Sequence, residues 1–377
     1  MIALTLLMTA CGGSGNGAPK PTATPTTTPT PVVPPNPPAT ATSAAPPTAA
    51  VTSTPVPTVA VDPKLPLAIA KLLKNQDGVF GILLMHPNGA VEYQLNADTP
   101  FIAASLYKLV LLANIFEKRE HGELSFDQDV ELLPEYFPEP GDFVDSFYDR
   151  TTVGSTPSID DLVFATASYS SNVAAKALLS LTDTASLDRT TLALGLEDTY
   201  LFIDPTAVTD WVSATATATS SNVGEAVAFV DRLAKEGPVN ITTPRDMCRY
   251  FQLLLDGKVI DPAVSAEILA LLKKQAIDTA FPKFLPGVEM AHKTGNLDHV
   301  VHDVGIIWTP TGPVILAAMI EDPPNDDHAT QIIQRLALIA YGTYDVPPFT
   351  AHAVDETSPV PDSPDGSAPS DQDSADG

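Results

Sequence analysis

The chain has 377 residues, among them 37 prolines and 21 glycines, and carries a formal net charge of −26. No stripe of basic residues interrupts this acidity, which argues against binding to nucleic acid or to anionic lipid headgroups through charge. Mean hydropathy is +0.09 and no uninterrupted apolar run is long enough for a membrane-spanning helix, so such a helix is not expected either.

The first eleven residues are apolar and end in small residues before Cys11. This segment resembles a bacterial lipoprotein signal, in which Leu7–Ala10 would be the cleavage box and Cys11 would carry the lipid. No basic residue precedes the apolar segment, which indicates that the true start lies upstream. We therefore expect an exported protein that is anchored by lipid to the outer face of the bacterial cell membrane, with an ordinary apolar N-terminus as the alternative.

Two further segments are predicted to be disordered. Residues 12–64 hold fourteen of the prolines, with Thr and Ala as their main companions, and residues 351–377 hold seven acidic residues and no Lys or Arg. Neither segment has enough large apolar side chains to offset the entropy cost of ordering it. This distribution predicts a tethering linker, a folded domain over residues 65–350 and a solvated acidic tail. A role for the tail in binding cations or basic partners is the less favoured alternative.

The folded domain begins and ends with predicted strands. Residues 79–86 and 90–95 flank a Pro-Asn-Gly turn and predict a β-hairpin. Helical patterns dominate from Ser105 to about Lys274, including a capping-box helix over 158–168 and helices over 172–181 and 243–257. Strands return at 288–292, 304–308 and 314–321, and an amphipathic helix closes the domain at 329–341. The expected fold is α/β (α+β): one antiparallel sheet built from both chain ends, flanked by helices, with an inserted all-helical subdomain.

Cys248 is the second of the two cysteines. If Cys11 carries lipid, the chain cannot form an internal disulfide and must rely on its core for stability. Since Cys248 falls inside a predicted helix and no His or Asn motif accompanies it, we expect a buried, unreactive thiol.

Three short polar motifs occur in order on these elements. Ser105 and Lys108 begin a helix, three residues apart, so that the amine and the hydroxyl share one face. A desolvated lysine can activate a serine hydroxyl, and a helix N-terminus offers N–H groups to an oxyanion. The other two motifs are Ser170-Ser171-Asn172 before a helix and Lys293-Thr294-Gly295 at the end of a strand. Taken singly, they would be interpreted as a solvated pair, a helix cap and a strand exit.

Together the three motifs resemble those of the class A β-lactamase and penicillin-binding serine hydrolase family. The resemblance extends over about residues 78–341 and includes the segments 241–247, 285–295 and 303–308. It implies a β-lactamase/transpeptidase fold and an acyl-enzyme mechanism on a β-lactam or a peptidoglycan stem peptide. It implies neither a metal nor a cofactor.

Residue by residue, the resemblance assigns the following roles. Ser105 would be the acylated nucleophile, Lys108 its activating partner and Ser170 the proton relay to the leaving nitrogen. Asn172 would hold the substrate amide or Lys108. Lys293 and Thr294 would bind the substrate carboxylate, with Gly295 beside them, and the backbone N–H groups of Ser105 and Asn296 would form the oxyanion hole. Ser171 stands where the family usually has Asp.

The second departure from the family concerns deacylation. Class A enzymes carry a Glu-x-x-Leu-Asn segment whose Glu activates water, and residues 194–240 contain no such segment. Asp204 and Asp210 fall roughly where the Glu should be, but Asp is one methylene shorter and Asp204 also suits a plain turn before proline. Two enzymatic outcomes therefore stay open: a β-lactamase that turns over, or a penicillin-binding or D-Ala-D-Ala peptidase-like hydrolase that acylates and stalls.

Two rival interpretations come from other classes of protein. His292, His299, His302 and Asp303 lie within twelve residues and could suggest zinc, but the i,i+3 histidines sit in a connection between strands and do not share a face. A non-catalytic lipoprotein that binds cell-wall peptides is the other rival, and intact nucleophile motifs speak against it. We expect a monomer with a small-molecule substrate.

Overall fold

The computed structural model describes residues 61–139, 144–203 and 239–349. The signal segment with Cys11, most of the predicted linker, the tail, and both Asp204 and Asp210 lie outside these residues. In chain order the helices and strands are α1 Lys64–Leu73, β1 Val79–Met85, β2 Val91–Leu95, β3 Phe101–Ile102, η1 Ala104–Leu106, α2 Tyr107–Glu120, η2 Pro134–Tyr136, η3 Arg150–Thr152, α3 Ile159–Ser168, α4 Asn172–Leu179, α5 Thr184–Ala193, β4 Tyr200–Ile203, β5 Val239–Thr242, α8 Pro244–Leu255, α9 Pro262–Leu272, η4 Phe281–Phe284, β6 Met290–Leu297, β7 Val300–Thr309, β8 Gly312–Glu321 and α10 Asp326–Ala340.

The main sheet has five antiparallel strands in the order β2-β1-β8-β7-β6. Strand β1 from the N-terminal hairpin pairs with β8 from the C-terminal end, with Val79 opposite Glu321 and Met85 opposite Ile315. The two ends of the domain therefore meet in the middle of the sheet. The predicted hairpin, the antiparallel sheet built from both ends and the mixed α/β fold are confirmed.

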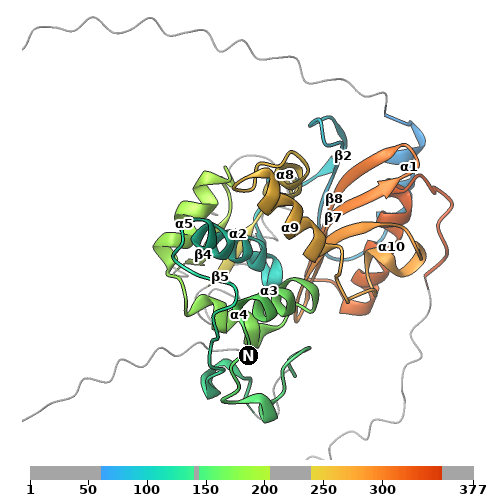
Figure 1. Cartoon of the computed structure of the whole chain (residues 1–377). Coiled ribbons are helices and arrows are strands. Elements are labelled where there is room, and N and C mark those ends of the chain that lie inside the picture. The colour runs from blue at the N-terminus through green and yellow to red at the C-terminus, as the bar shows by residue number, and fades with distance from the viewer. Residues whose placement is uncertain (1–60, 140–143, 204–238, 350–377) are drawn as a thin grey trace, which may run out of the picture.

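Side chains alternate between the two faces of this sheet, as a period of two residues requires. On β8, Ile315, Ala317 and Met319 enter one apolar cluster, and Leu316 and Ala318 enter another. The second cluster is covered by α1 and α10, and the first by the helical part of the molecule (Figure 1). The sheet is thus buried on both sides and divides the core into two layers.

Two helices of the helical part begin at the caps that the sequence indicates. Ser158 caps α3, with its hydroxyl accepting from the Asp161 N–H and the Asp161 carboxylate accepting from the Ser158 N–H. Thr243 caps α8 with Pro244 as the first helical residue. Helix α8 packs across β1, β7 and β8, and α2 runs through the centre of the helical part (Figure 1).

Three features differ from the sequence-based expectation. The block expected to be helical also contains β4 and β5, and β5 pairs with both β3 and β4 in a separate three-stranded sheet. Helix α1 precedes the hairpin. The strand expected at 288–292 begins at Met290 and continues to Leu297, so Lys293, Thr294 and Gly295 lie inside β6 rather than at its end. These polar residues broke the apolar pattern that would have predicted the longer strand.

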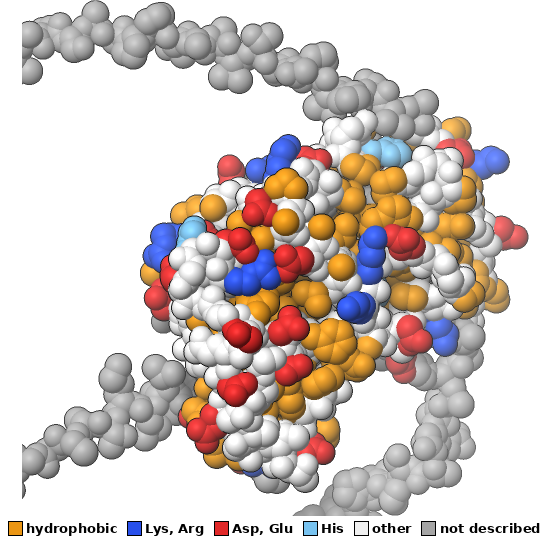
Figure 2. All heavy atoms as spheres, in the orientation of Figure 1, with side chains coloured by type: hydrophobic (Ala, Val, Ile, Leu, Met, Phe, Trp, Pro, Cys, Tyr) orange, Lys and Arg blue, Asp and Glu red, His pale blue; other side chains and the backbone are white. Residues whose placement is uncertain are grey.

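The surface carries acidic side chains over much of the helical part. On the face in Figure 2, red acidic side chains are scattered and blue basic ones stand singly or in small groups. Within the parts of the chain that are described, no helix combines the length and the apolar character that a membrane crossing needs.

Candidate active site

Ser105 lies at the start of the central helix. It is the middle residue of η1, which continues directly into α2, and its side chain is partly exposed. The residue before it, Ala104, has a φ of 45°, in the left-handed region that a residue with a Cβ rarely adopts. One turn later Lys108 is fully buried. The turn at Ala104 therefore leaves the Ser105 hydroxyl partly exposed, and the first turn of α2 buries the Lys108 amine.

Ser170 lies in the turn between α3 and α4 and also has a positive φ, of 58°. The next residue, Ser171, is buried and caps α4 by accepting from the Ala174 N–H. Asn172 is the first residue of α4. The cap interpretation of this motif is therefore correct for Ser171, while its neighbours on both sides point their side chains at lysine.

Lys293 and Thr294 are buried on β6, and Gly295 follows them. A Cβ on Gly295 would lie 3.1 Å from the Ala103 carbonyl oxygen and 3.1 Å from Leu106 Cγ. A side chain here would require these neighbours to shift, so glycine favours the close approach of β6 to η1. This contact places the strand, including the exposed Asn296, directly beside the turn that carries Ser105.

The three motifs meet at two lysine amines. The Lys108 amine donates to the Ser170 carbonyl (2.5 Å) and to Asn172 Oδ1 (2.7 Å), and lies 3.4 Å from Ser170 Oγ. The Lys293 amine donates to the same Ser170 Oγ at 2.7 Å and to the Thr294 carbonyl at 2.8 Å. Ser170 is therefore the residue that both lysines share. Within the described parts of the chain, the Ser105 hydroxyl makes no hydrogen bond.

Both amines have a pKa below the ordinary value of a lysine. Burial and the neighbouring charge of Lys293 keep the pKa of Lys108 well below its ordinary value, and only Asp145 acts in the opposite direction. Burial lowers the pKa of Lys293 to about 7, against a smaller opposing effect of Asp303. A neutral amine uses its two N–H groups on Ser170 and Asn172 and retains a lone pair, so Lys108 can accept a proton.

Asp145 is a site residue that sequence reasoning missed. Its buried carboxylate accepts from Ser171 Oγ (2.8 Å), from the Asn172 N–H (2.6 Å) and from the Val173 N–H (3.0 Å). It comes from a loop 26 residues before Ser171, and no local pattern marks it. The one indirect signal was the Ser at position 171, which leaves the motif without its usual carboxylate.

The histidines that suggested zinc have other partners. His292 Nδ1 lies 2.8 Å from Asp303, whose other oxygen accepts from the Phe281 N–H. His302 bonds the Ile102 carbonyl and the Ile320 N–H, and burial lowers its pKa to about 4. Among the described residues no three His, Cys, Asp or Glu side chains form a group able to hold a metal ion. Cys248 is buried and its pKa is raised by burial, as expected for an unreactive thiol.

The fold and the site define a class of protein: an α/β domain with helices on both faces of an antiparallel sheet, in which a Ser-x-x-Lys turn, a Ser-x-Asn turn and a Lys-Thr-Gly strand converge. Residues 64–344 match the model of the β-lactamase enzyme family. The chain belongs to this family.

Individual relatives agree with this placement. A β-lactamase structure from Sphaerobacter thermophilus is 26% identical, with a TM-score of 0.59 and coverage of 76% of this chain and 98% of that one. A β-lactamase structure from Xanthomonas campestris (22% identical, TM-score 0.60, coverage 74% and 97%) and the structure of PBP-A (21%, 0.59, 77% and 98%) share the fold. A curated relative, the β-lactamase regulatory protein BlaB of Streptomyces cacaoi, is 24% identical over 260 residues, 61% of this chain and 80% of that protein.

Proposed function

We propose that this protein is a serine hydrolase of the β-lactamase family that acts on β-lactams through an acyl-enzyme on Ser105. The observation that carries the proposal is the pair of buried amines on Ser170: a low-pKa Lys108 one turn after Ser105, and Lys293 on the opposite side.

In the proposed reaction, neutral Lys108 takes the Ser105 proton as the hydroxyl attacks the lactam carbonyl. The developing oxyanion is bound by the backbone N–H groups of Ser105 and Asn296, each such donor contributing about 3 kcal/mol in acyl-transfer sites. Ser170, whose hydroxyl is held by Lys293, gives its proton to the leaving nitrogen and receives in exchange the proton that Lys108 took from Ser105. Protonated Lys293, together with Thr294, binds the substrate carboxylate.

A second candidate function is a penicillin-binding or peptidase-like protein that acylates and deacylates slowly. Two observations favour it: residues 194–240 lack a Glu-x-x-Leu-Asn segment, and one relative is named a regulatory protein. In the first function Asp204 or Asp210 would act as the general base of deacylation. In the second function neither residue would have this role.

Labelling with a fluorescent penicillin and turnover of nitrocefin separate the candidates. Rapid nitrocefin hydrolysis that Ser105→Ala abolishes supports the β-lactamase. Stable label on the wild type, absent from Ser105→Ala and without turnover, supports the second candidate. A folded wild type that neither takes label nor hydrolyses nitrocefin would contradict both and favour a non-catalytic cell-wall-binding protein.

We further propose that Cys11 carries a lipid that anchors the protein to the outer face of the cell membrane, with residues 12–64 as a spacer. Globomycin treatment of cells that express the protein tests this, since blocked signal cleavage would increase its mass. An unchanged mass and a Cys11→Ala variant that stays in the membrane fraction would contradict the anchor.

A further inference from the structure

We propose that Asp145 is a positioning residue of the acylation site, supplying from a separate loop the carboxylate that Ser171 lacks, and that it fixes Ser170 and Asn172 and sets the charge around Lys108. The inference rests on the proposed function.

The surroundings of the Asp145 carboxylate are built for a negative charge. One oxygen accepts from the N–H groups of Phe147 and Tyr148 (3.0 and 2.9 Å) and from Ser171 Oγ, and the other accepts from the N–H groups of Asn172 and Val173. All five partners are donors. An amide at this position would direct its NH₂ group at backbone N–H groups, so a carboxylate is the group that satisfies the site.

The same loop holds the chain on both sides of Ser170. Ser146, the neighbour of Asp145, donates from its hydroxyl to the Tyr169 carbonyl at 2.5 Å. Asp145 binds residues 171–173 on the other side. Ser170 itself has a positive φ, a strained conformation that persists only where the surrounding structure imposes it. The Asp145–Ser146 pair therefore imposes the backbone geometry that points the Ser170 carbonyl and hydroxyl at the two amines.

Asp145 also reaches Lys108 through one residue. The Asn172 N–H binds Asp145 at 2.6 Å while its side-chain oxygen accepts from Lys108 at 2.7 Å. Among the described residues, the charged groups that act on Lys108 are Lys293, which favours the neutral amine, and Asp145, which favours the ammonium; the Tyr107 ring lies 6.0 Å from the amine. The pKa of Lys108 thus depends on a balance that Asp145 partly sets.

Asp145→Asn tests the proposal. We expect acylation by a fluorescent penicillin to fall about ten- to a hundredfold at the pH optimum, because Ser170 and Asn172 lose their fixed positions. We also expect the acid limb of the acylation rate to move to lower pH, by about half a unit or more, because the charge that favours the Lys108 ammonium is gone. Loss of stability alone would not move that limb.

Relocating the carboxylate provides the rescue. Asp145→Asn combined with Ser171→Asp places the carboxylate at the helix cap of α4, where the family motif has it, and should restore most of the rate and return the acid limb. Ser171→Ala keeps the charge of Asp145 and removes one hydrogen bond to its carboxylate. This variant should therefore lower the acylation rate without moving the acid limb of the rate profile. The matched control is Asp261→Asn, since Asp261 caps α9 with two backbone N–H bonds and is remote in the chain from all three motifs.

NMR titration of the ¹³Cε signal of Lys108 in wild type and Asp145→Asn measures the effect of Asp145 on the pKa of Lys108 without requiring turnover. One outcome would overturn the inference and leave the proposed function standing. In it the wild type is acylated, and Asp145→Asn has the same acylation rate, the same acid limb of the rate profile and the same Lys108 titration as the wild type. A wild type that is not acylated contradicts the proposed function, and an unmoved Lys108 titration then overturns the charge assigned to Asp145 as well. If Asp145→Asn does not fold, a Ser171→Ala variant with the wild-type rate would overturn the positioning role.

Discussion

Lys293 and Lys108 are both fully buried and donate to one serine, which is a costly arrangement for two amines. A buried ammonium is destabilising unless it is paired, and this cost lowers the pKa of both amines. The lowered pKa values are therefore a consequence of burial and also the property that lets one of these lysines act as a base. Stability and reactivity oppose each other at these two positions.

Lys293→Met makes this opposition measurable. Since the folded-state pKa of Lys293 is depressed to about 7, its stabilising contribution is present above about pH 10.5 and is lost as pH falls through 7. At pH 6 the wild type keeps a buried ammonium, whereas the variant has an apolar chain of similar size. We expect Lys293→Met to be about 1 to 3 kcal/mol more stable at pH 6 by urea denaturation, and to lose at least tenfold in acylation by anionic penicillins.

The salt dependence of the same variant reports on long-range charge. The chain is strongly acidic, so an anionic substrate needs the local positive charge of Lys293 to approach. The acylation defect of Lys293→Met should therefore be larger at low salt, where the repulsion is less screened. An equal defect at all salt concentrations would indicate that Lys293 acts only by contact.

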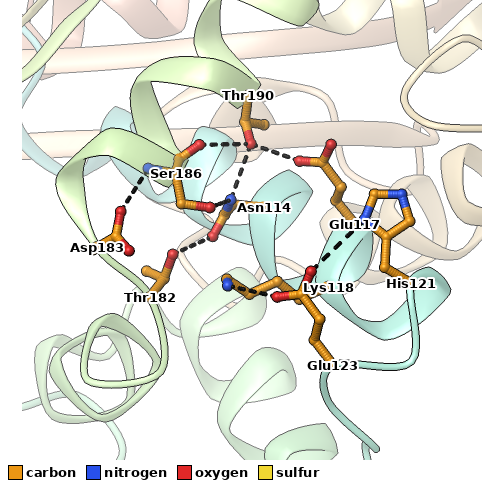
Figure 3. A network of polar contacts seen from close by, with 9 residues as sticks. All are labelled: Asn114, Glu117, Lys118, His121, Glu123, Thr182, Asp183, Ser186 and Thr190. Atoms are coloured by element: carbon orange, nitrogen blue, oxygen red, sulfur yellow. Dashed lines mark hydrogen bonds and ion pairs between the residues drawn. The ribbon is translucent and has the colours of Figure 1, made fainter.

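At the scale of the helices, α2 is held by a buried polar network as well as by apolar packing (Figure 3). Asn114 donates to Ser186 Oγ (2.9 Å) and Thr190 Oγ1 (3.0 Å) on α5 and accepts from Thr182 (2.6 Å). Thr190 donates in turn to Glu117 on α2 at 2.8 Å. The helix that carries Lys108 is thus fixed to α5 by directional bonds two turns beyond the site.

Asn114→Ala should destabilise the fold by about 2 to 4 kcal/mol, because it leaves buried hydroxyl groups without their partner. Acylation measured on the folded fraction should change little, since Lys108 keeps its own bonds. The matched control is Glu123→Gln, which breaks the exposed Lys118–Glu123 pair of the same region and should leave the melting temperature unchanged (Figure 3). A larger effect of Glu123→Gln than of Asn114→Ala would contradict the role of the buried network.

These elements also show what the sequence could predict. The hairpin, the Ser158 and Thr243 caps and strand β8 each carry a local signal, either alternation or a cap, and were predicted. Strands β4 and β5 have four residues each and pair with segments distant in sequence, so no local pattern announces them. The polar residues Lys293 and Thr294 interrupt the apolar pattern of β6, so the sequence there resembles a loop. Their burial comes from contacts within the site, which the sequence pattern does not show. The position of Asp145 depends on tertiary contacts alone.

At the scale of the whole molecule, buried titratable groups shape the dependence of stability on pH. Asp246 on α8 accepts from Thr199 Oγ1 and from the Asp198 N–H, and burial raises its pKa to about 6. A raised carboxyl pKa means that its contribution to stability is present below about pH 4 and is lost as pH rises through 6. Lys293, whose pKa is lowered to about 7, acts with the opposite slope above pH 7.

We therefore expect stability to decline between about pH 4 and 6 in part because Asp246 ionises. Asp246→Asn keeps an oxygen that can accept from Thr199 and from the backbone of Asp198, and it cannot ionise. The variant should lack this part of the decline and be about 1 to 2 kcal/mol more stable at pH 7, measured by urea denaturation across the pH range. A variant less stable than the wild type at pH 7 would mean that Thr199 requires the charge of Asp246 and not only its oxygen.

The position of β6 at the edge of the five-stranded sheet has a further consequence. Strands β1, β8 and β7 have a paired strand on each side and apolar cover on both faces, so we expect their amide protons to exchange with solvent more slowly than those of the edge strands. Strand β6 is paired with β7 alone within this sheet, and it can detach locally at a smaller free-energy cost. Lys293, the residue proposed to bind the substrate carboxylate, therefore lies on an edge strand, while Ser170, to which its amine donates, lies in the turn between α3 and α4, so that local detachment of β6 would break the Lys293–Ser170 hydrogen bond.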